Sequence, residues 1–134
     1  SYYVISNGIC TINFAYKKND IIYYPDLIKV GVALDTGEII SLNSTGYLMN
    51  HAERTFDSNI IDSKSAQNNV SPLLAVESIN LACIPTKGLN EVLCYEFNCI
   101  SIDVENVIVY INSKTGLEEN ILILLKYDNG ILAI

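Results

Sequence analysis

A strand–turn–strand pattern that occurs twice constrains the fold of this chain more than any other feature. Residues 30–40 and 107–121 each contain an apolar run, a polar turn that ends in Thr-Gly, and a second apolar run. Residues 11–16 precede the first copy at nearly the same separation as residues 92–97 precede the second. Such a repeat predicts two modules of similar construction, each with its own apolar face to bury.

The first module is predicted to span residues 1–52 and to consist of strands only. Residues 9–17 alternate, which places Ile12, Phe14 and Tyr16 on one face of a half-buried strand. We expect strands to continue through residue 49. Gly37 ends a tight turn because glycine readily adopts a positive φ. Pro25 is predicted at an edge or a connection, since it has no N–H to donate to a neighbouring strand.

Residues 53–72 are rich in polar side chains and are predicted to form a linker with one short helix. Asp62 or Ser63 is expected to cap this helix, with Ala66 and Val70 on one face. Residues 73–134 return to strands and are predicted as the second module. The fold class is therefore α+β, with tandem modules that each consist of an antiparallel sheet covered on one face by a helix.

Charge and hydrophobicity exclude several classes of protein. The chain has 134 residues and a net charge of -7, with eight basic residues against fifteen acidic ones, which argues against binding nucleic acid. Half of the residues are hydrophobic and 17% are charged, so an ordered core is expected. No apolar run approaches the roughly 20 residues of a membrane-spanning helix.

The four cysteines give little indication of chemistry. Cys10, Cys83, Cys94 and Cys99 lack the close pairs that are typical of zinc sites, and a disulfide between two of them stays open. A hydrolase would need Cys94 or Cys99 activated by His51, and we favour a solvated or loop-capping role for this histidine. We predict no catalytic residues, no metal ligands and no cofactor.

Tyrosines gather in the first module, and tyrosine suits surfaces where one end of the ring is apolar and the other is wet. Filling of a sheet face by aromatic rings is the alternative explanation. The candidate interaction surface consists of neighbouring residues of the first module, namely Tyr23, Tyr24, Pro25, Asp26, Tyr47, Asn50 and His51.

Residues 24–40, 46–51, 91–97 and 109–116 closely resemble the C-terminal region of the YpeB family of spore germination proteins. That region is built from PepSY modules, and the resemblance extends through almost the whole chain. A PepSY module begins with its helix, whereas the first copy here opens on the strand predicted for residues 2–5. The first module therefore lacks its N-terminal helix, and its uncovered apolar face predicts self-association of this chain.

The resemblance also implies a function. It implies a non-enzymatic interaction or regulatory module that stabilises, localises or restrains the cortex-lytic enzyme SleB. The location would be the spore, at the outer side of the inner membrane beside the cortex, where a preceding N-terminal segment would anchor the parent protein. The alternative is a module that binds spore-cortex peptidoglycan directly through its tyrosines.

Overall fold

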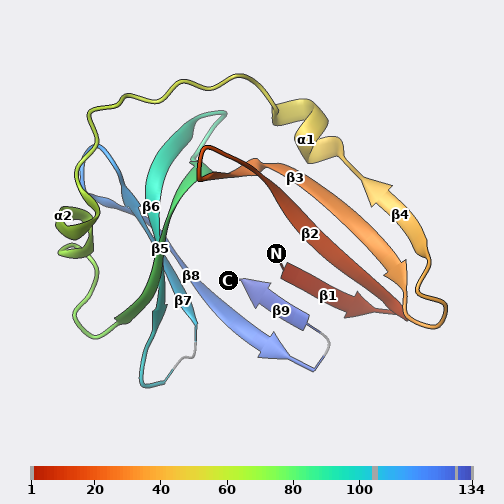
Figure 1. Cartoon of the computed structure of the whole chain (residues 1–134). Helices are drawn as coiled ribbons and strands as arrows, with labels where there is room; N and C mark the ends of the chain where they lie inside the picture. Colours follow the sequence, from red (N-terminus) through yellow and green to blue (C-terminus); the bar gives the residue numbers. More distant parts are fainter. Residues whose placement is uncertain (1, 104–105, 129, 134) are drawn as a thin grey trace.

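The computed structural model describes residues 2–103, 106–128 and 130–133, and these residues form nine strands and two short helices (Figure 1). Their order along the chain is β1 (Tyr2–Ser6), β2 (Ile9–Lys18), β3 (Ile21–Ala33), β4 (Ile39–Asn43), α1 (Thr45–Asn50), α2 (Ser63–Gln67), β5 (Ala75–Pro85), β6 (Glu91–Ile100), β7 (Val107–Asn112), β8 (Glu118–Tyr127) and β9 (Gly130–Ala133). Within these ranges no helix has the length and apolar character that crossing a membrane requires.

All nine strands belong to one sheet, in the order β2-β1-β9-β8-β7-β6-β5-β3-β4. An additional β2–β3 pairing closes every strand except β4 into a ring. Figure 1 shows β1 and β9 between the group β2–β4 and the group β5–β8. The strands of the two predicted modules are thus joined by hydrogen bonds, while the module boundaries stay a prediction.

Two short pairings link the halves of the ring. β3 runs parallel to β5 at three positions, among them Tyr23 opposite Cys83. β1 meets β9 where Val4 lies opposite Gly130. A Cβ atom at Gly130 would lie only 2.5 Å from the Tyr3 carbonyl oxygen, so glycine is needed for the two strands to approach this closely.

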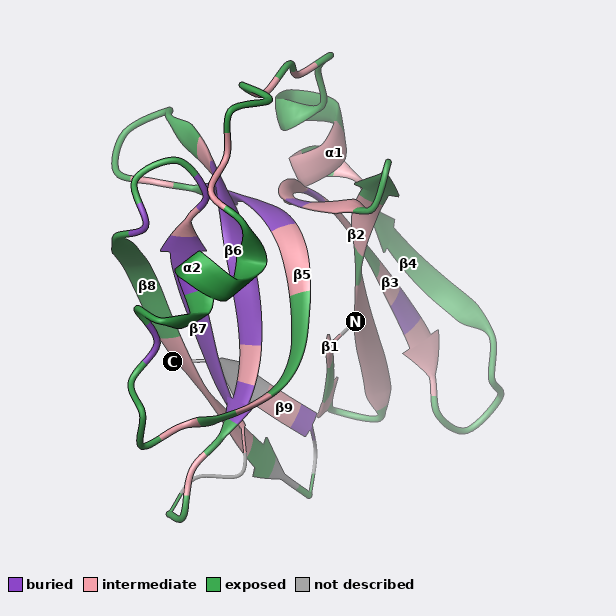
Figure 2. Cartoon of the chain, turned by 60° about the vertical axis from the view of Figure 1, so that its left-hand side comes forward, coloured by how far each residue is buried: buried purple, intermediate pink, exposed green. Residues whose placement is uncertain are grey.

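The larger core cluster lies between α2 and the strands β6 and β7. Ala66 and Val70 pack there against Tyr95, Phe97 and neighbouring side chains. Figure 2 shows α2 in front of the buried parts of these strands. Asp62 caps α2 by accepting a hydrogen bond from the Ser65 N–H, as predicted, although the helix already ends at Gln67.

Residues 45–50 differ from the prediction, which continues the strands of the first module to residue 49. They form α1, which lies against β3. The physical reason is close packing: a Cβ atom at Gly46 would be only 2.9 Å from the Leu27 carbonyl oxygen. The Asn43 side chain also accepts a hydrogen bond from the Thr45 N–H and turns the chain after β4.

The two Thr-Gly turns have matching geometry. Gly37 donates to the Ala33 carbonyl over 2.8 Å, and Gly116 donates to the Asn112 carbonyl over 2.9 Å. Both glycines have positive φ, 75° and 73°. Beyond the turns the copies diverge, because the first leads into α1 and the second ends in β9. The similarity of two whole modules stays a prediction.

Candidate functional site

The candidate site is built around a bulge in β3. Tyr23 lies opposite Tyr16 of β2, but the next pair along is Leu27 with Ala15, so residues 24–26 have no partner on β2. Pro25 occupies this bulge, where its missing N–H costs no sheet hydrogen bond. The bulge brings Asp26 to the same side as Tyr23, and the Asp26 side chain is completely buried.

Arg54, from the segment after α1, forms a two-pronged ion pair with Asp26. Its Nη1 donates to Asp26 Oδ2 over 2.9 Å, and its Nη2 donates to Asp26 Oδ1 over 2.7 Å. The Arg54 side chain is 9% exposed. Two parallel hydrogen bonds between a guanidinium and a carboxylate fix both the position and the orientation of the two groups.

Arg54 also joins the first half of the chain to the second. Its Nε donates to Oε2 of Glu91, the first residue of β6, over 2.6 Å. The Cys83 thiol of β5 lies 3.5 Å from the same carboxylate oxygen. The guanidinium carbon of Arg54 lies 5.2 Å from the centre of the Tyr23 ring, a cation–π contact. One side chain therefore connects β3, β6 and the segment between them.

His51 attaches the end of α1 to the bulge. Its Nδ1 lies 2.7 Å from Asp26 Oδ2, and its ring stacks on Tyr47 at 4.3 Å between centroids. The Asn50 side chain donates to the Pro25 carbonyl over 3.0 Å. Rings and polar groups of this region, including Tyr16, His51 and Arg54, line a hollow of about 140 Å³. The His51 side chain is 33% exposed and reaches solvent.

The charges of this site stabilise one another. Burial disfavours the charged form of Asp26, but hydrogen bonds from Arg54 and His51 outweigh burial and lower the pKa of the carboxyl. Hydrogen bonds to Asp26 and Glu91 raise the pKa of Arg54 further above its already high ordinary value. Both groups are ionised at neutral pH, and we therefore treat them as a buried ion pair.

The lowered pKa of Asp26 predicts a loss of stability in acid. A carboxyl whose pKa is lower in the folded state stabilises the fold above its unfolded pKa, and this contribution is lost as the pH falls through the folded pKa. The ordinary value is 3.8, so the free energy of unfolding should decline below about pH 4. Asp57 and Asp62 have lowered pKa values as well and add to the decline.

The Asp26→Asn variant isolates the contribution of Asp26. In urea unfolding followed by circular dichroism, the stability difference between the natural chain and this variant should shrink as the pH falls from about 6 to about 2.5. A difference that is constant over this range would contradict the assignment of the lowered pKa to Asp26.

Most residues of the predicted interaction surface come together at this site. Tyr23, Pro25, Asp26, Tyr47, Asn50 and His51 lie around the bulge, but Tyr23 and Asp26 are buried and cannot contact a partner directly. Tyr24 is the exception, because successive residues of a strand point to opposite faces. Its hydroxyl donates to Glu96 over 2.5 Å on the other side of β3.

Arg54 and Glu91 were not among the residues predicted for this surface, and Cys83 was considered only for a zinc site or a disulfide. Arg54 lies in the predicted linker, yet it is the only arginine in a chain with seven lysines. Arginine is preferred over lysine where a carboxylate must be held by two hydrogen bonds, and this imbalance is a signal that could have found it.

The described residues that line the hollow do not complete a nucleophile–histidine–aspartate triad. Asp26 and His51 resemble the acid–base half of a catalytic triad, but no serine, threonine or cysteine is present among the described residues that line the hollow. Burial raises the pKa of Cys83 and of Cys94 to about 12, which keeps these thiols protonated. All four cysteines are free. The described part of the chain contains no group of three potential metal ligands.

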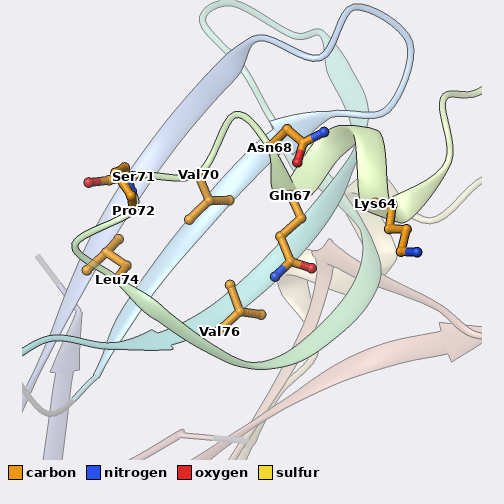
Figure 3. A pocket seen from close by; sticks show the side chains of 8 residues that line it. All are labelled: Lys64, Gln67, Asn68, Val70, Ser71, Pro72, Leu74 and Val76. Atoms are coloured by element: carbon orange, nitrogen blue, oxygen red, sulfur yellow. The ribbon is translucent and has the colours of Figure 1, made fainter.

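A larger hollow of about 550 Å³ lies between α2 and the start of β5 (Figure 3). In that view Lys64 and Asn68 point away from Val70, Leu74 and Val76. The polar groups that line this larger hollow do not converge on one point, so the hollow is a weaker candidate for a binding site.

Comparison with known proteins agrees with this fold. A family model described as YpeB sporulation, PepSY1 and PepSY2 domains matches residues 1–57. The Bacillus megaterium YpeB C-terminal domain superposes with a TM-score of 0.84 and 25% sequence identity, over 94% of this chain and 56% of that one. The fold is thus that of a PepSY-containing sporulation protein.

Curated relatives carry the same name. Sporulation protein YpeB of Halalkalibacterium halodurans is 36% identical over 115 residues, 86% of this chain, and that of Bacillus subtilis is 33% identical over 113 residues. The chain belongs to the YpeB family of sporulation proteins and has a spore-associated role. It spans about a quarter of these relatives, 26% and 25% of their lengths.

Proposed function

We propose that this chain is a non-enzymatic binding module of a YpeB-family protein, and that it stabilises, localises or restrains the cortex-lytic enzyme SleB. The proposed location is the outer side of the spore inner membrane, beside the cortex. The observation that carries the proposal is an exposed apolar surface on two consecutive elements. This β4–α1 patch consists of side chains that are 51–77% exposed, namely Ile39, Ile40, Leu42, Leu48 and Met49.

The position of β4 supports binding of a protein. β4 pairs with β3 and lies at the end of the sheet, outside the ring, so its other edge has backbone groups available for an added strand. Exposed apolar residues on consecutive elements are typical of protein–protein contacts, whereas single exposed residues are ordinary. The ion pair of Asp26 with Arg54, and the contact of His51 with Asp26, tie the segment after α1 to β3 and so hold the α1 part of this patch in place.

The test measures binding of purified chain to purified SleB by calorimetry, together with the rate at which SleB releases fragments from cortex peptidoglycan. We expect saturable binding and a lower rate with the natural chain. Leu42→Glu and Met49→Glu should each weaken binding at least tenfold. Leu89→Glu, at a fully exposed position in the β5–β6 turn, is the matched control and should change it less than twofold.

Two results would refute this proposal, namely an absence of binding and a loss in the Leu89→Glu control equal to that in the patch variants. A SleB rate that the chain leaves unchanged would exclude restraint but not stabilisation or localisation.

Direct binding of cortex peptidoglycan is the second candidate function. The stacked rings of Tyr47 and His51 beside the small hollow favour it, because aromatic faces suit contact with the apolar faces of sugar rings. Cosedimentation of the chain with purified cortex in the absence of SleB separates the two functions. If this second function is correct, the natural chain cosediments with cortex and the Tyr47→Ala variant does not.

Self-association is a further prediction for the chain in solution. Tyr3, Val4 and Phe14 of β1 and β2 are 42–48% exposed, which leaves apolar surface available to a second copy. Multi-angle light scattering should give a mass that rises above that of one chain as the protein concentration increases. A mass of one chain, 14.8 kDa, at millimolar concentration would contradict the prediction.

A further inference from the structure

A second cavity lies on the opposite side of β3 from the Asp26 site. Its volume is about 520 Å³, which falls within the range of small-molecule sites. Apolar side chains make up much of its wall, including Phe14, Ile22, Leu27 and Leu124. Polar side-chain groups in the lining come from Tyr2, Asn13, Lys17, Tyr24, Glu96 and Asn98. Glu96 and Asn13 have unusual surroundings.

The first of these is Glu96 of β6. Its side chain is buried, since the residue is 3% exposed, and its Oε2 accepts hydrogen bonds from Tyr24 over 2.5 Å and from Tyr110 over 2.9 Å. Among the described residues no lysine, arginine or histidine lies within ion-pair distance of it. A buried carboxylate without a cation is costly, and two neutral donors compensate it only in part.

The second is Asn13 of β2, which lines the same cavity. Its side-chain oxygen is buried and accepts no hydrogen bond within the described ranges, the single buried side-chain atom there of this kind. Buried acceptors are nearly always satisfied, so an exception calls for an explanation. Asn13 and Glu96 therefore supply two acceptors that lack a full set of donors.

The remaining polar groups also favour a donor in the cavity. Burial and the Glu96 charge raise the pKa of Tyr24 and of Tyr110, so both hydroxyls stay protonated. Each hydroxyl donates its hydrogen bond to Glu96 and has no second hydrogen to donate. The rings of Tyr2 and Tyr24 add aromatic surface to the wall. Lys17 is the one cation of the lining, and its side chain is 57% exposed and paired with Asp20 at 3.8 Å.

We propose that this cavity binds a small organic cation, a primary ammonium or guanidinium group carried on a short apolar chain. The charged group would donate hydrogen bonds to Glu96, and the chain would pack against the apolar wall formed by Phe14, Leu27 and Leu124. Carboxylate and aromatic surface together suit such a group, and the net charge of -7 attracts cations. A free amine and a lysine or arginine side chain of a protein share this chemistry.

Calorimetry and amide chemical shifts of the full chain test the proposal with hexylamine, butylguanidine and hexanol as probes. Both cations should bind saturably and shift amides of β2, β3 and β6 around the cavity, whereas hexanol, which lacks the charge, should bind at least tenfold more weakly. Short peptides with a central lysine or arginine form the second arm. Binding of the peptides but not of the free cations would assign the site to a protein side chain.

Glu96→Gln removes the charge and keeps the shape, and it should weaken binding of either cation at least tenfold. Ala15→Phe places a ring in the cavity without altering Glu96 and should abolish binding. Glu118→Gln, an exposed carboxylate of β8, is the matched control and should leave binding unchanged.

The proposal fails if neither the free cations nor the peptides bind, if hexanol binds as well as hexylamine, or if the Ala15→Phe chain binds as tightly as the natural one. These outcomes do not depend on SleB, so they are distinct from failure of the proposed function.

Discussion

Replacing Arg54 by alanine is expected to lower the free energy of unfolding by about 3–5 kcal/mol. The variant leaves the Asp26 carboxylate buried with only the His51 side chain as a partner. An uncompensated buried charge is the main cost, and the lost contacts to Glu91 and to the Asn50 carbonyl add to it. Because a domain of this size has a total stability of about 5–15 kcal/mol, the loss is a large share of the free energy of unfolding.

Urea unfolding followed by circular dichroism measures this effect. Lys114→Ala is the matched control, since Lys114 pairs with Asp57 at 3.2 Å with both side chains at least 50% exposed, and it should cost no more than about 1 kcal/mol. Arg54→Lys keeps the charge but not the two-pronged geometry and should recover part of the loss. An equal loss in the free energy of unfolding for Arg54→Ala and Lys114→Ala would show that the buried Asp26–Arg54 pair does not hold the two halves of the chain together.

Phe97→Ala is also expected to lower the free energy of unfolding by about 3–5 kcal/mol, because it removes a buried apolar side chain. The Phe97 side chain is completely buried and belongs to the cluster that contains Ala66 of α2, Val70 and the β7 residues Val109 and Ile111. Truncation removes buried apolar surface and leaves a cavity between α2 and the sheet. The protein cannot refill this space without moving the helix, because residues on both sides are tightly packed.

Thermal and urea unfolding give the cost, and proteolysis near α2 reports whether the helix loosens. Ile102→Ala provides the control, since Ile102 is fully exposed and its replacement should change stability by less than about 0.5 kcal/mol. A loss below about 1 kcal/mol for Phe97→Ala would mean that this cluster is not the main source of stability.

Local features of the fold could be predicted from the sequence. The strands β2 and β6, the two Thr-Gly turns, the Asp62 cap and the pairing of Ala66 with Val70 on one face all depend on neighbours a few residues apart. The predicted alternation of burial is absent, because Phe14 of β2 is 48% exposed and the middle of β6 is buried on both faces. Patterns of period two and short turn motifs report such local structure directly. The interaction surface named for Tyr23 and Asp26 stays a prediction, and the burial of these two residues keeps them from contacting a partner directly.

Features that depend on distant partners could not be predicted in this way. The parallel β3–β5 pair and the β1–β9 pair join segments far apart in the sequence. The helix α1 exists where Gly46 fits against Leu27, a contact that no local pattern shows. The bulge in β3 is likewise not visible in a local pattern, although it determines the burial of Tyr23 and Asp26. The ion pair of Arg54 with Asp26 depends in addition on the path of the segment after α1.

The contact of β1 with β9 also affects the rate of folding and the order in which the strands pair. Val4 and Gly130 lie near opposite ends of the chain, so the closing pair forms only after nearly every other strand is in place. Chains dominated by such distant contacts fold slowly, over milliseconds to seconds. During synthesis, β1 emerges long before β9, and its free edge is exposed to other chains for that whole interval.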